Sequence, residues 1–128
     1  MPIEYSLVKR GKPGAPAADK KLYATARAQG QKTIEDLARR IGQMSTVSPI
    51  DVVAVLRALV IVVPEVLVDG DTVYLDGFGA FRVTLRGAGA ATPDEHTRAL
   101  IEDVNVVFEP DARFDQALQN AELRRVSA

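Results

Sequence analysis

The 128-residue chain contains no cysteine and no tryptophan, and His96 is its single histidine. Disulfide bonds and thiolate chemistry are therefore excluded, and so is a metal site built from several histidines. No uninterrupted apolar run reaches the roughly 18 residues that a membrane-spanning helix needs, because Arg57 and the pair Pro64-Glu65 divide the longest one. We therefore expect a cytoplasmic protein without a membrane segment, a metal or a cofactor.

The chain also lacks an excess of either charge. Its 16 basic and 17 acidic side chains leave a net charge of −1, which disfavours a nucleic-acid binder that relies on bulk electrostatics. The distribution is nevertheless uneven, because residues 1–32 carry seven cations and two anions, a net charge of +5, and residues 33–128 carry −6. This pattern predicts a basic N-terminal extension, residues 1–32, on an acidic body.

The extension is expected to contain short strands around a turn-rich loop. Ile3–Lys9 alternates loosely and predicts a strand, and the glycines and prolines of residues 10–21 predict a loop. Leu22–Ala28 fits a strand or a poor helix, and Tyr5 and Tyr23 favour two strands that meet at an edge. The loop is either a solvated linker or a basic arm that touches phosphate. The cations available for such contacts are Lys9, Arg10, Lys12, Lys20 and Lys21.

The stretch Ser48–Leu67 predicts the central helix of the fold. Ser48 suits an N-cap, Pro49 suits the first helical position, and Arg57 is the one charge in the apolar middle of the segment. A helix that is apolar around most of its circumference must be covered on several sides. A chain of this length has little material for that purpose, so either strands wrap the helix or a second copy of the chain covers one face.

A shorter helix is expected to open at Thr33, just before the central one. Two helices joined by a short turn invite comparison with a helix-turn-helix motif, whose second helix lies in the major groove. Here the second helix offers Ile50, Val52 and Leu56, which have almost no hydrogen-bonding groups for base edges. The central helix therefore belongs in a core.

Strands are expected after the central helix, in D-G-D-T-V-Y-L-D-G-F-G-A-F-R-V-T-L-R, which begins at Asp69. The pattern predicts strands at Thr72–Leu75 and Phe81–Arg86 with a tight reversal between them. A further strand is expected at Val104–Phe108 and a last helix at Ala112–Leu123. The four phenylalanines are spaced so that they point inward, and we assign them to the core: Phe78, Phe81, Phe108 and Phe114.

The order of elements resembles the HU and integration host factor family of bacterial DNA-bending proteins. The motif Gly70-Asp71-x-Val73-x-Leu75-x-Gly77-Phe78-Gly79-x-Phe81-x-Val83 carries the likeness, which covers Thr33 to Asn120. It implies an α+β fold in an intertwined homodimer, with two N-terminal helices, a three-stranded antiparallel sheet that extends into β-ribbon arms, and a short C-terminal helix. Residues 33–123 would be the HU-like DNA-binding domain, and residues 1–32 resemble the N-terminal extension of longer variants.

In this family paired arms embrace the minor groove, and a proline near each arm tip wedges between base steps. The resemblance places the arm at about residues 82–103 and the wedge at Pro93. This arm departs from the family because its three arginines are outnumbered by four carboxylates, and phosphates repel an acidic tip. Pro93 is therefore either the wedge or an ordinary turn proline.

The resemblance implies a non-enzymatic, nucleoid-associated homodimer that binds and bends double-stranded DNA with little sequence preference. The alternative is an HU-fold structural or protein-interaction module that binds DNA weakly or not at all because its arms are acidic. Neither expects a small-molecule substrate, since no pocket or activated nucleophile accompanies the carboxylates. The expected DNA contacts are Arg82, Arg86, Arg98, Pro93 and the five N-terminal cations. The expected dimer core is Val52, Val55, Leu56, Leu59, Phe78, Phe81 and Phe108.

Overall fold

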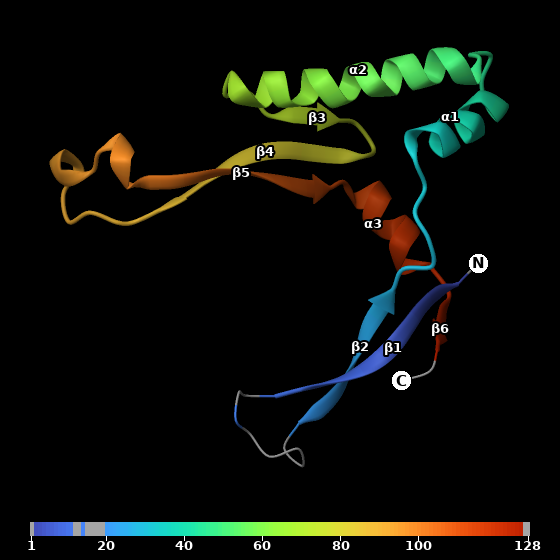
Figure 1. Ribbon diagram of the computed structural model, residues 1–128, viewed down its shortest axis with the longest axis horizontal. Coiled ribbons are helices and arrows are strands. Elements are labelled where there is room, and N and C mark those ends of the chain that lie inside the picture. The colour runs from blue at the N-terminus through green and yellow to red at the C-terminus, as the bar shows by residue number, and fades with distance from the viewer. Residues whose placement is uncertain (1, 12–13, 15–19, 127–128) are drawn as a thin grey trace. The chain divides into compact units, whose positions relative to one another are not determined.

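The computed structural model describes residues 2–11, 14 and 20–126, and the chain divides into two compact units. The first unit comprises Met1–Thr33 and Ala117–Ala128, and the second comprises Ile34–Gln116. The described residues form a mixed α+β fold with three α-helices and two three-stranded sheets, one sheet in each unit (Figure 1). Lys12, one of the expected DNA contacts, lies outside the described residues.

The sheet of the first unit has the strand order β2-β1-β6. β1 (Ile3–Arg10) and β2 (Lys21–Arg27) pair antiparallel, so the expected pair of strands is confirmed. The two tyrosines do not face each other, however, because Tyr5 lies opposite Ala26 and Tyr23 lies opposite Val8. Side chains alternate between the faces of a strand, so the two rings lie on opposite faces of the sheet.

The third strand of this sheet corrects the expected last helix. α3 spans Ala112–Gln119, and Leu123, which was expected in that helix, lies in the strand β6 (Leu123–Arg125). β6 pairs parallel with β1, and the Ile3 N–H donates to the Glu122 carbonyl at 2.7 Å. The free edge of β1 supplies backbone partners that a lone helical turn would lack, and this pairing outweighs the local helix preference.

Two helices open the second unit, α1 (Ile34–Gln43) and α2 (Pro49–Val68). The predicted start of α2 is confirmed: the Asp51 N–H donates to the Ser48 Oγ at 3.3 Å, and proline holds the first helical position. α2 lies along β3 and β4 of the sheet (Figure 1). The apolar side chains that are buried among the described residues are those of Ala38, Val52 and Leu67.

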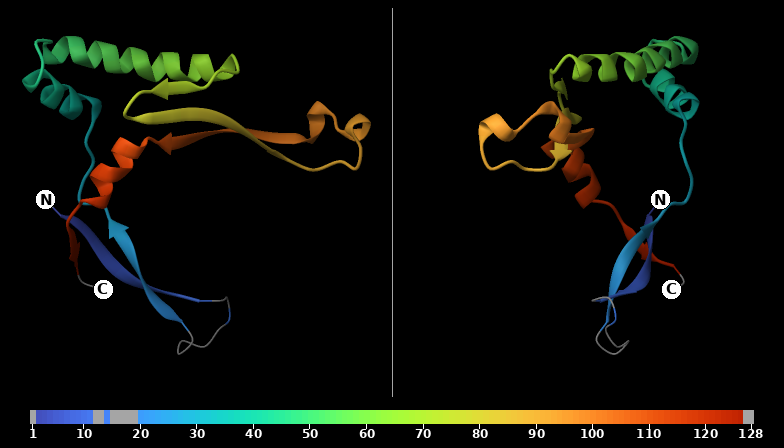
Figure 2. Two further views of the ribbon diagram at one scale, coloured as in Figure 1. Left: turned by 180° about the vertical axis from the view of Figure 1, so that it is seen from behind. Right: turned by 60° about the vertical axis from the view of Figure 1, so that its left-hand side comes forward.

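The sheet of the second unit has the order β3-β4-β5. Its strands are β3 (Val73–Leu75), β4 (Gly79–Gly87) and β5 (Ile101–Pro110). β4 and β5 are longer than the sequence predicts, since they pair antiparallel from the reversal at Gly79 as far as Gly87. We call β4, β5 and the connection between them the ribbon, which extends past the C-terminal end of α2 (Figure 2).

The four phenylalanines, which the sequence assigns to the core, form one cluster at the base of the ribbon, in which Phe78 is 45% exposed and the other three are half-buried. Their ring centroids lie 5.0 to 5.8 Å apart in edge-on and tilted arrangements, which favour aromatic pairs. The reversal before β4 depends on glycine, because Gly77 has a φ of +80°. A Cβ atom on Gly79 would lie 2.7 Å from the Phe108 ring, so only glycine lets the strand approach the cluster this closely.

Candidate nucleic-acid interface

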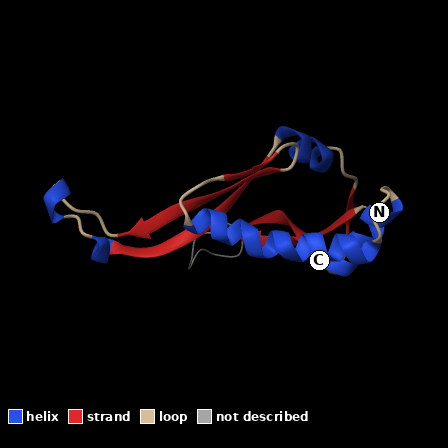
Figure 3. Cartoon of the chain, turned by 90° about the horizontal axis from the view of Figure 1, so that it is seen from above, coloured by secondary structure: helices blue, strands red, loops and turns tan. Residues whose placement is uncertain are grey.

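The ribbon is the most extended part of the second unit. β4 and β5 stay paired up to Arg86 opposite Asp103, and the register shifts between Arg86 and Gly87. Two 3-10 turns, Pro93–Glu95 and Arg98–Leu100, form part of the tip (Figure 3). This is the segment in which the resemblance expects an arm.

The ribbon arginines are paired with carboxylates. Arg82 Nε lies 2.5 Å from Glu109 Oε1, and Arg86 forms an ion pair with Asp103 and lies 3.7 Å from Glu102 Oε2. All these side chains are substantially exposed, so each pair stabilises the fold by about 0 to 1 kcal/mol. A competing anion can therefore displace the carboxylates at little energetic cost.

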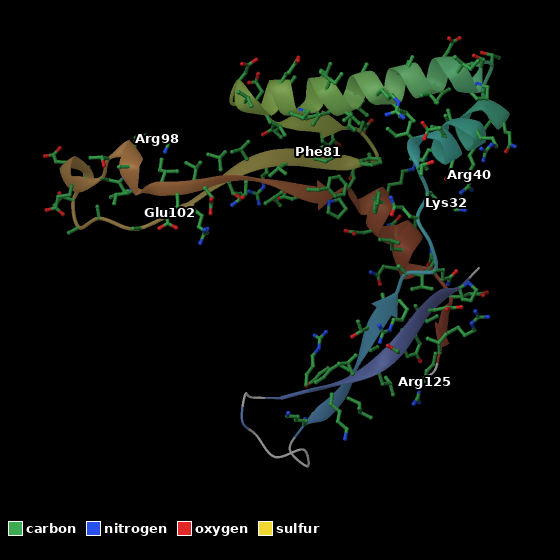
Figure 4. The ribbon with its side chains drawn as sticks, viewed as in Figure 1. Lys32, Arg40, Phe81, Arg98, Glu102 and Arg125 are labelled. Carbon is green, nitrogen blue, oxygen red and sulfur yellow. The ribbon has the colours of Figure 1, made fainter. Side chains whose placement is uncertain are left out.

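The tip presents one proline and one arginine beside two carboxylates. Pro93 is exposed and opens the first turn, followed by Asp94 and Glu95. The Arg98 Nη1 donates to the Ile101 carbonyl at 3.3 Å, and its side chain lies near the end of the ribbon (Figure 4). Of the three ribbon arginines, Arg98 is thus the one for which the structure gives a backbone partner and no carboxylate among the described residues.

The N-terminal cations do not share one surface. Lys9 and Arg10 are consecutive in β1, so their side chains lie on opposite faces of the sheet. Arg10 lies opposite Lys21 in the register, and Lys20 immediately precedes β2. The expected set is therefore divided, with Arg10 and Lys21 on one face and Lys9 on the other.

Two cations that the sequence did not indicate join Arg10 and Lys21. Glu4 lies on the same face as Arg10, and its register partners are Arg27 in β2 and Arg124 in β6. The alternation of β2 could have placed Arg27 on the same face as Lys21. Nothing in the sequence could have placed Arg124, because β6 was expected to be helix.

The residues expected in a dimer core are only partly covered within one chain. Val52 is buried, and Leu56, Phe81 and Phe108 are half-buried. Val55, Leu59 and Phe78 are 65%, 40% and 45% exposed. Exposed apolar side chains that are grouped in this way are typical of an interaction surface.

None of the helices in the described parts of the chain has the length and apolarity to cross a bilayer.

Asp111 ties the start of α3 to the reversal between β3 and β4. Its carboxylate accepts hydrogen bonds from the Gly77 N–H at 3.0 Å, the Ala112 N–H at 2.7 Å and the Tyr74 hydroxyl at 3.2 Å. These bonds, that of Gly77 first, hold the pKa of Asp111 below its usual value. The negative charge of Asp111 raises the pKa of Tyr74, and its hydrogen bond adds to the effect. The cluster serves the fold of the turn.

No feature of the described residues suggests catalysis or metal binding. Histidine and carboxylate groups do not gather there in a set of three that could hold a metal. A shallow hollow of about 410 Å³ in the first unit is lined by Pro2, Ile3, Arg27, Gln29, Gly30 and Lys32, which include no carboxylate, histidine or hydroxyl group that could act with Lys32.

Comparison with known proteins gives a family match and two similar structures. A family model described as "HU domain fused to wHTH, Ig, or Glycine-rich motif" matches residues 1–125. A chain from Bacteroides vulgatus ATCC 8482, provisionally described as a bacterial DNA-binding protein, is similar over 98% of this chain with a TM-score of 0.66 and 16% identity. This chain spans about half, 48%, of that protein's length.

A second solved structure, the HU protein of Anabaena in a cocrystal with DNA, is similar over 70% of this chain and 99% of its own, with a TM-score of 0.53 and 21% identity. At these identities both structures show the fold. No protein with a curated description matches the sequence.

Proposed function

The chain belongs to the family of HU domains fused to wHTH, Ig or glycine-rich motifs, and we propose that it is a non-enzymatic, histone-like protein that binds and bends duplex DNA as a homodimer. Family membership supports the DNA-binding role and a nucleoid-associated location. The observation that carries the proposal for this chain is the ribbon of β4 and β5 with Pro93 at its tip. The second unit would be the HU-like DNA-binding domain, and its ribbon would act as the arm.

Exposed apolar surface supports the homodimer. On α2, Val55 is 65% and Ile61 is 62% exposed, although they lie on different sides of the helix. On the ribbon, exposed apolar side chains continue outward from the phenylalanine cluster on one face, at Val83 opposite Val106 and Leu85 opposite Val104. A second copy would cover both surfaces, and in a two-fold dimer each chain supplies the same patch.

The exposed ion pairs of the ribbon allow DNA binding but weaken it. A phosphate that approaches Arg82 or Arg86 must replace a carboxylate whose attraction is small in water. The displaced carboxylates then lie close to the phosphates, which repel them. We therefore expect binding that is modest in strength and strongly dependent on salt.

Pro93 is proposed as the wedge. It is exposed and its ring lies at the start of a turn, so it can contact a base step without rearrangement of the strands. An apolar side chain inserted between base steps unstacks them and kinks the duplex. The neighbouring Asp94 and Glu95 repel phosphate, so the bend should be weaker than that of a basic arm, above all at low salt where this repulsion is least screened.

Fluorescence anisotropy of a labelled duplex of about 30 base pairs tests the function, with end-to-end FRET to report bending. If the three ribbon arginines of both chains contact phosphate, six contacts should reduce affinity by about 10³-fold between roughly 50 and 200 mM salt. Linear, nicked and pre-bent duplexes should all bind at the lower salt concentration. Failure to bind any of them there would remove the proposed function.

The alternative role as an interaction module receives no support from these observations. The family description and the two similar structures concern HU domains and DNA-binding proteins. The alternative rests on the acidic character of the ribbon. The ion pairs there are exposed and weak, so phosphate can replace the carboxylates.

A further inference from the structure

We propose that one face of the β2-β1-β6 sheet is a second contact surface for the backbone of duplex DNA, an inference that rests on the DNA-binding function proposed above. We call it the basic face and define it by its four cations, Arg10, Lys21, Arg27 and Arg124. The neighbouring strands β1 and β2 contribute to it together with β6, which is far from both in the sequence.

The register gives the basic face its length. Arg10 lies opposite Lys21 at one end, and Glu4 lies between Arg27 and Arg124 at the other. Glu4 and Arg10 are six residues apart in β1, which corresponds to about 20 Å at roughly 3.3 Å per residue. A duplex of that length contains about six base-pair steps. The two groups of cations are therefore spaced to reach separate phosphates.

Most cations of this face have no carboxylate as a partner among the described residues. The Arg27 Nε donates to the Ser6 Oγ at 2.6 Å, and the Arg10 Nη2 donates to a threonine hydroxyl at 3.5 Å. Among the described residues of the basic face, Glu4 is the one carboxylate, and it pairs with Arg124. Four cations against one anion leave a net charge of +3, whereas the arginines of the ribbon at β4 face carboxylates.

Ser6 holds part of the surface in place. Its side chain is fully buried, at 0% exposure, while Arg27 remains exposed. The hydrogen bond therefore anchors the guanidinium against the sheet without removing its other N–H donors from solvent. A guanidinium positioned in this way loses little further conformational freedom when it binds phosphate, because its planar fork is already oriented.

The opposite face has a different character. Ile3, Leu7 and Leu22 lie there, together with the cations Lys9 and Arg125. Lys9 and Arg125 are exposed, as Arg10 and Lys21 are. The sheet thus offers two pairs of cations of equal charge on opposite faces, which makes a matched control possible.

The distribution of charge between the units favours DNA as the partner. The first unit holds nine cations and three anions, a net charge of +6, and the second holds seven and 14, a net charge of −7. If the second unit binds DNA despite its negative charge, uncompensated cations elsewhere in the chain would add to the attraction that the ribbon arginines supply. Tyr23, which is 47% exposed and lies on the same face, adds a hydroxyl that can donate to phosphate.

A double variant tests the proposal in the full chain. Arg10→Gln with Lys21→Gln should lower the magnitude of the salt slope of duplex binding by about two per chain and weaken affinity at least about tenfold near 0.1 M salt. The matched control, Lys9→Gln with Arg125→Gln, removes the same charge from the opposite face. It should bind almost as wild type does, because the proposal withdraws Lys9 from the DNA contacts expected from the sequence: it lies on the face opposite Arg10.

A charge-preserving double variant, Arg10→Lys with Lys21→Arg, should also bind as wild type does, which separates charge from shape. Circular dichroism and light scattering establish that all variants keep the fold and oligomeric state of the wild-type chain. Equal losses in the two Gln doubles, or no loss in either, would overturn the basic face while the proposed DNA binding stands. An altered self-association with unchanged DNA affinity would identify an acidic protein surface as the partner instead. A wild-type chain that binds no duplex would remove both proposals together.

Discussion

Val55 on α2 gives the sharpest test of the proposed homodimer. Its side chain is exposed in the single chain although it was expected in the dimer core, and the helix around it is apolar. Val55→Asp places a carboxylate where a second copy would bury the position. Dimerisation should then fail, because the charge would have to enter the interface without a partner.

The magnitude follows from the exposed share of the side chain. Full burial of a valine contributes roughly 1.5 kcal/mol, and 65% of Val55 is still open to a partner, which leaves about 1 kcal/mol. An unpaired carboxylate at the interface adds a penalty of at least about 2 kcal/mol. A two-fold dimer contains the site twice, so the total is about 6 kcal/mol, or about four orders of magnitude in Kd.

Sedimentation equilibrium or light scattering over a concentration series measures the effect. Val55→Ala removes only the apolar share, so it should raise Kd roughly thirty-fold, equivalent to about 2 kcal/mol. Ala28→Asp is the control, because Ala28 is exposed and belongs to the first unit, outside α2 and the ribbon that a second copy would cover. It should leave the dimer intact.

Dissociation of the Val55→Asp chain, with or without loss of helical circular dichroism, agrees with the proposal, since obligate dimers often have no stable monomer. A Kd equal to that of wild type and of Ala28→Asp would refute it. In that case the apolar surface of α2 would be covered by something other than a second copy.

Three further predictions concern the ribbon and the turn at its base. Asp103→Asn should leave Arg86 with its longer contact to Glu102 and tighten duplex binding about threefold to tenfold, since one repulsive charge per chain is removed from the ribbon. Asp71→Asn, the same change outside the ribbon, should leave affinity unchanged in an anisotropy titration. Pro93→Ala should reduce the FRET change on binding while affinity falls less than about tenfold, and an unchanged bend would exclude the wedge. Because its folded-state pKa is lowered, Asp111 should stabilise the fold above its unfolded pKa of about 4 and lose that effect as the pH falls through its folded pKa. Denaturant titrations should accordingly show that Asp111→Asn is destabilised at pH 7 and that its difference from wild type disappears in acid, and a constant difference would contradict this account.

The second unit could be predicted from the sequence to a large extent because its signals are local. The Ser48 cap and the proline after it fix the start of α2, and the glycines around Phe78 fix the reversal into β4. The length of the ribbon strands was underestimated. The alternation of apolar and polar residues weakens beyond Arg86, although backbone pairing continues to Gly87. Hydrogen bonds between strands do not require an apolar pattern, so the pattern gives the buried part of a strand rather than its full length.

The first unit was harder to predict because its third strand depends on a distant partner. β6 has three residues and stands next to β1, more than 110 positions earlier in the chain. A segment this short carries no periodic signal of its own, and its backbone groups are satisfied only when the edge of β1 is present. The basic face could therefore not be predicted in full, because Arg124 belongs to it solely through the pairing of β6 with β1.

The arrangement of β1 also decides how the N-terminal cations should be tested. Deletion of residues 1–21 would remove most cations of the extension, but it would also remove β1, the central strand of β2-β1-β6. β2 and β6 would then lose the partner to which both are bonded, and a fall in DNA affinity could not be separated from loss of the sheet. Exchanges on a single face avoid this problem, because side chains on opposite faces of one strand share the same backbone hydrogen bonds. Any difference between the Arg10 and Lys9 variants must therefore arise from the surface that each side chain occupies.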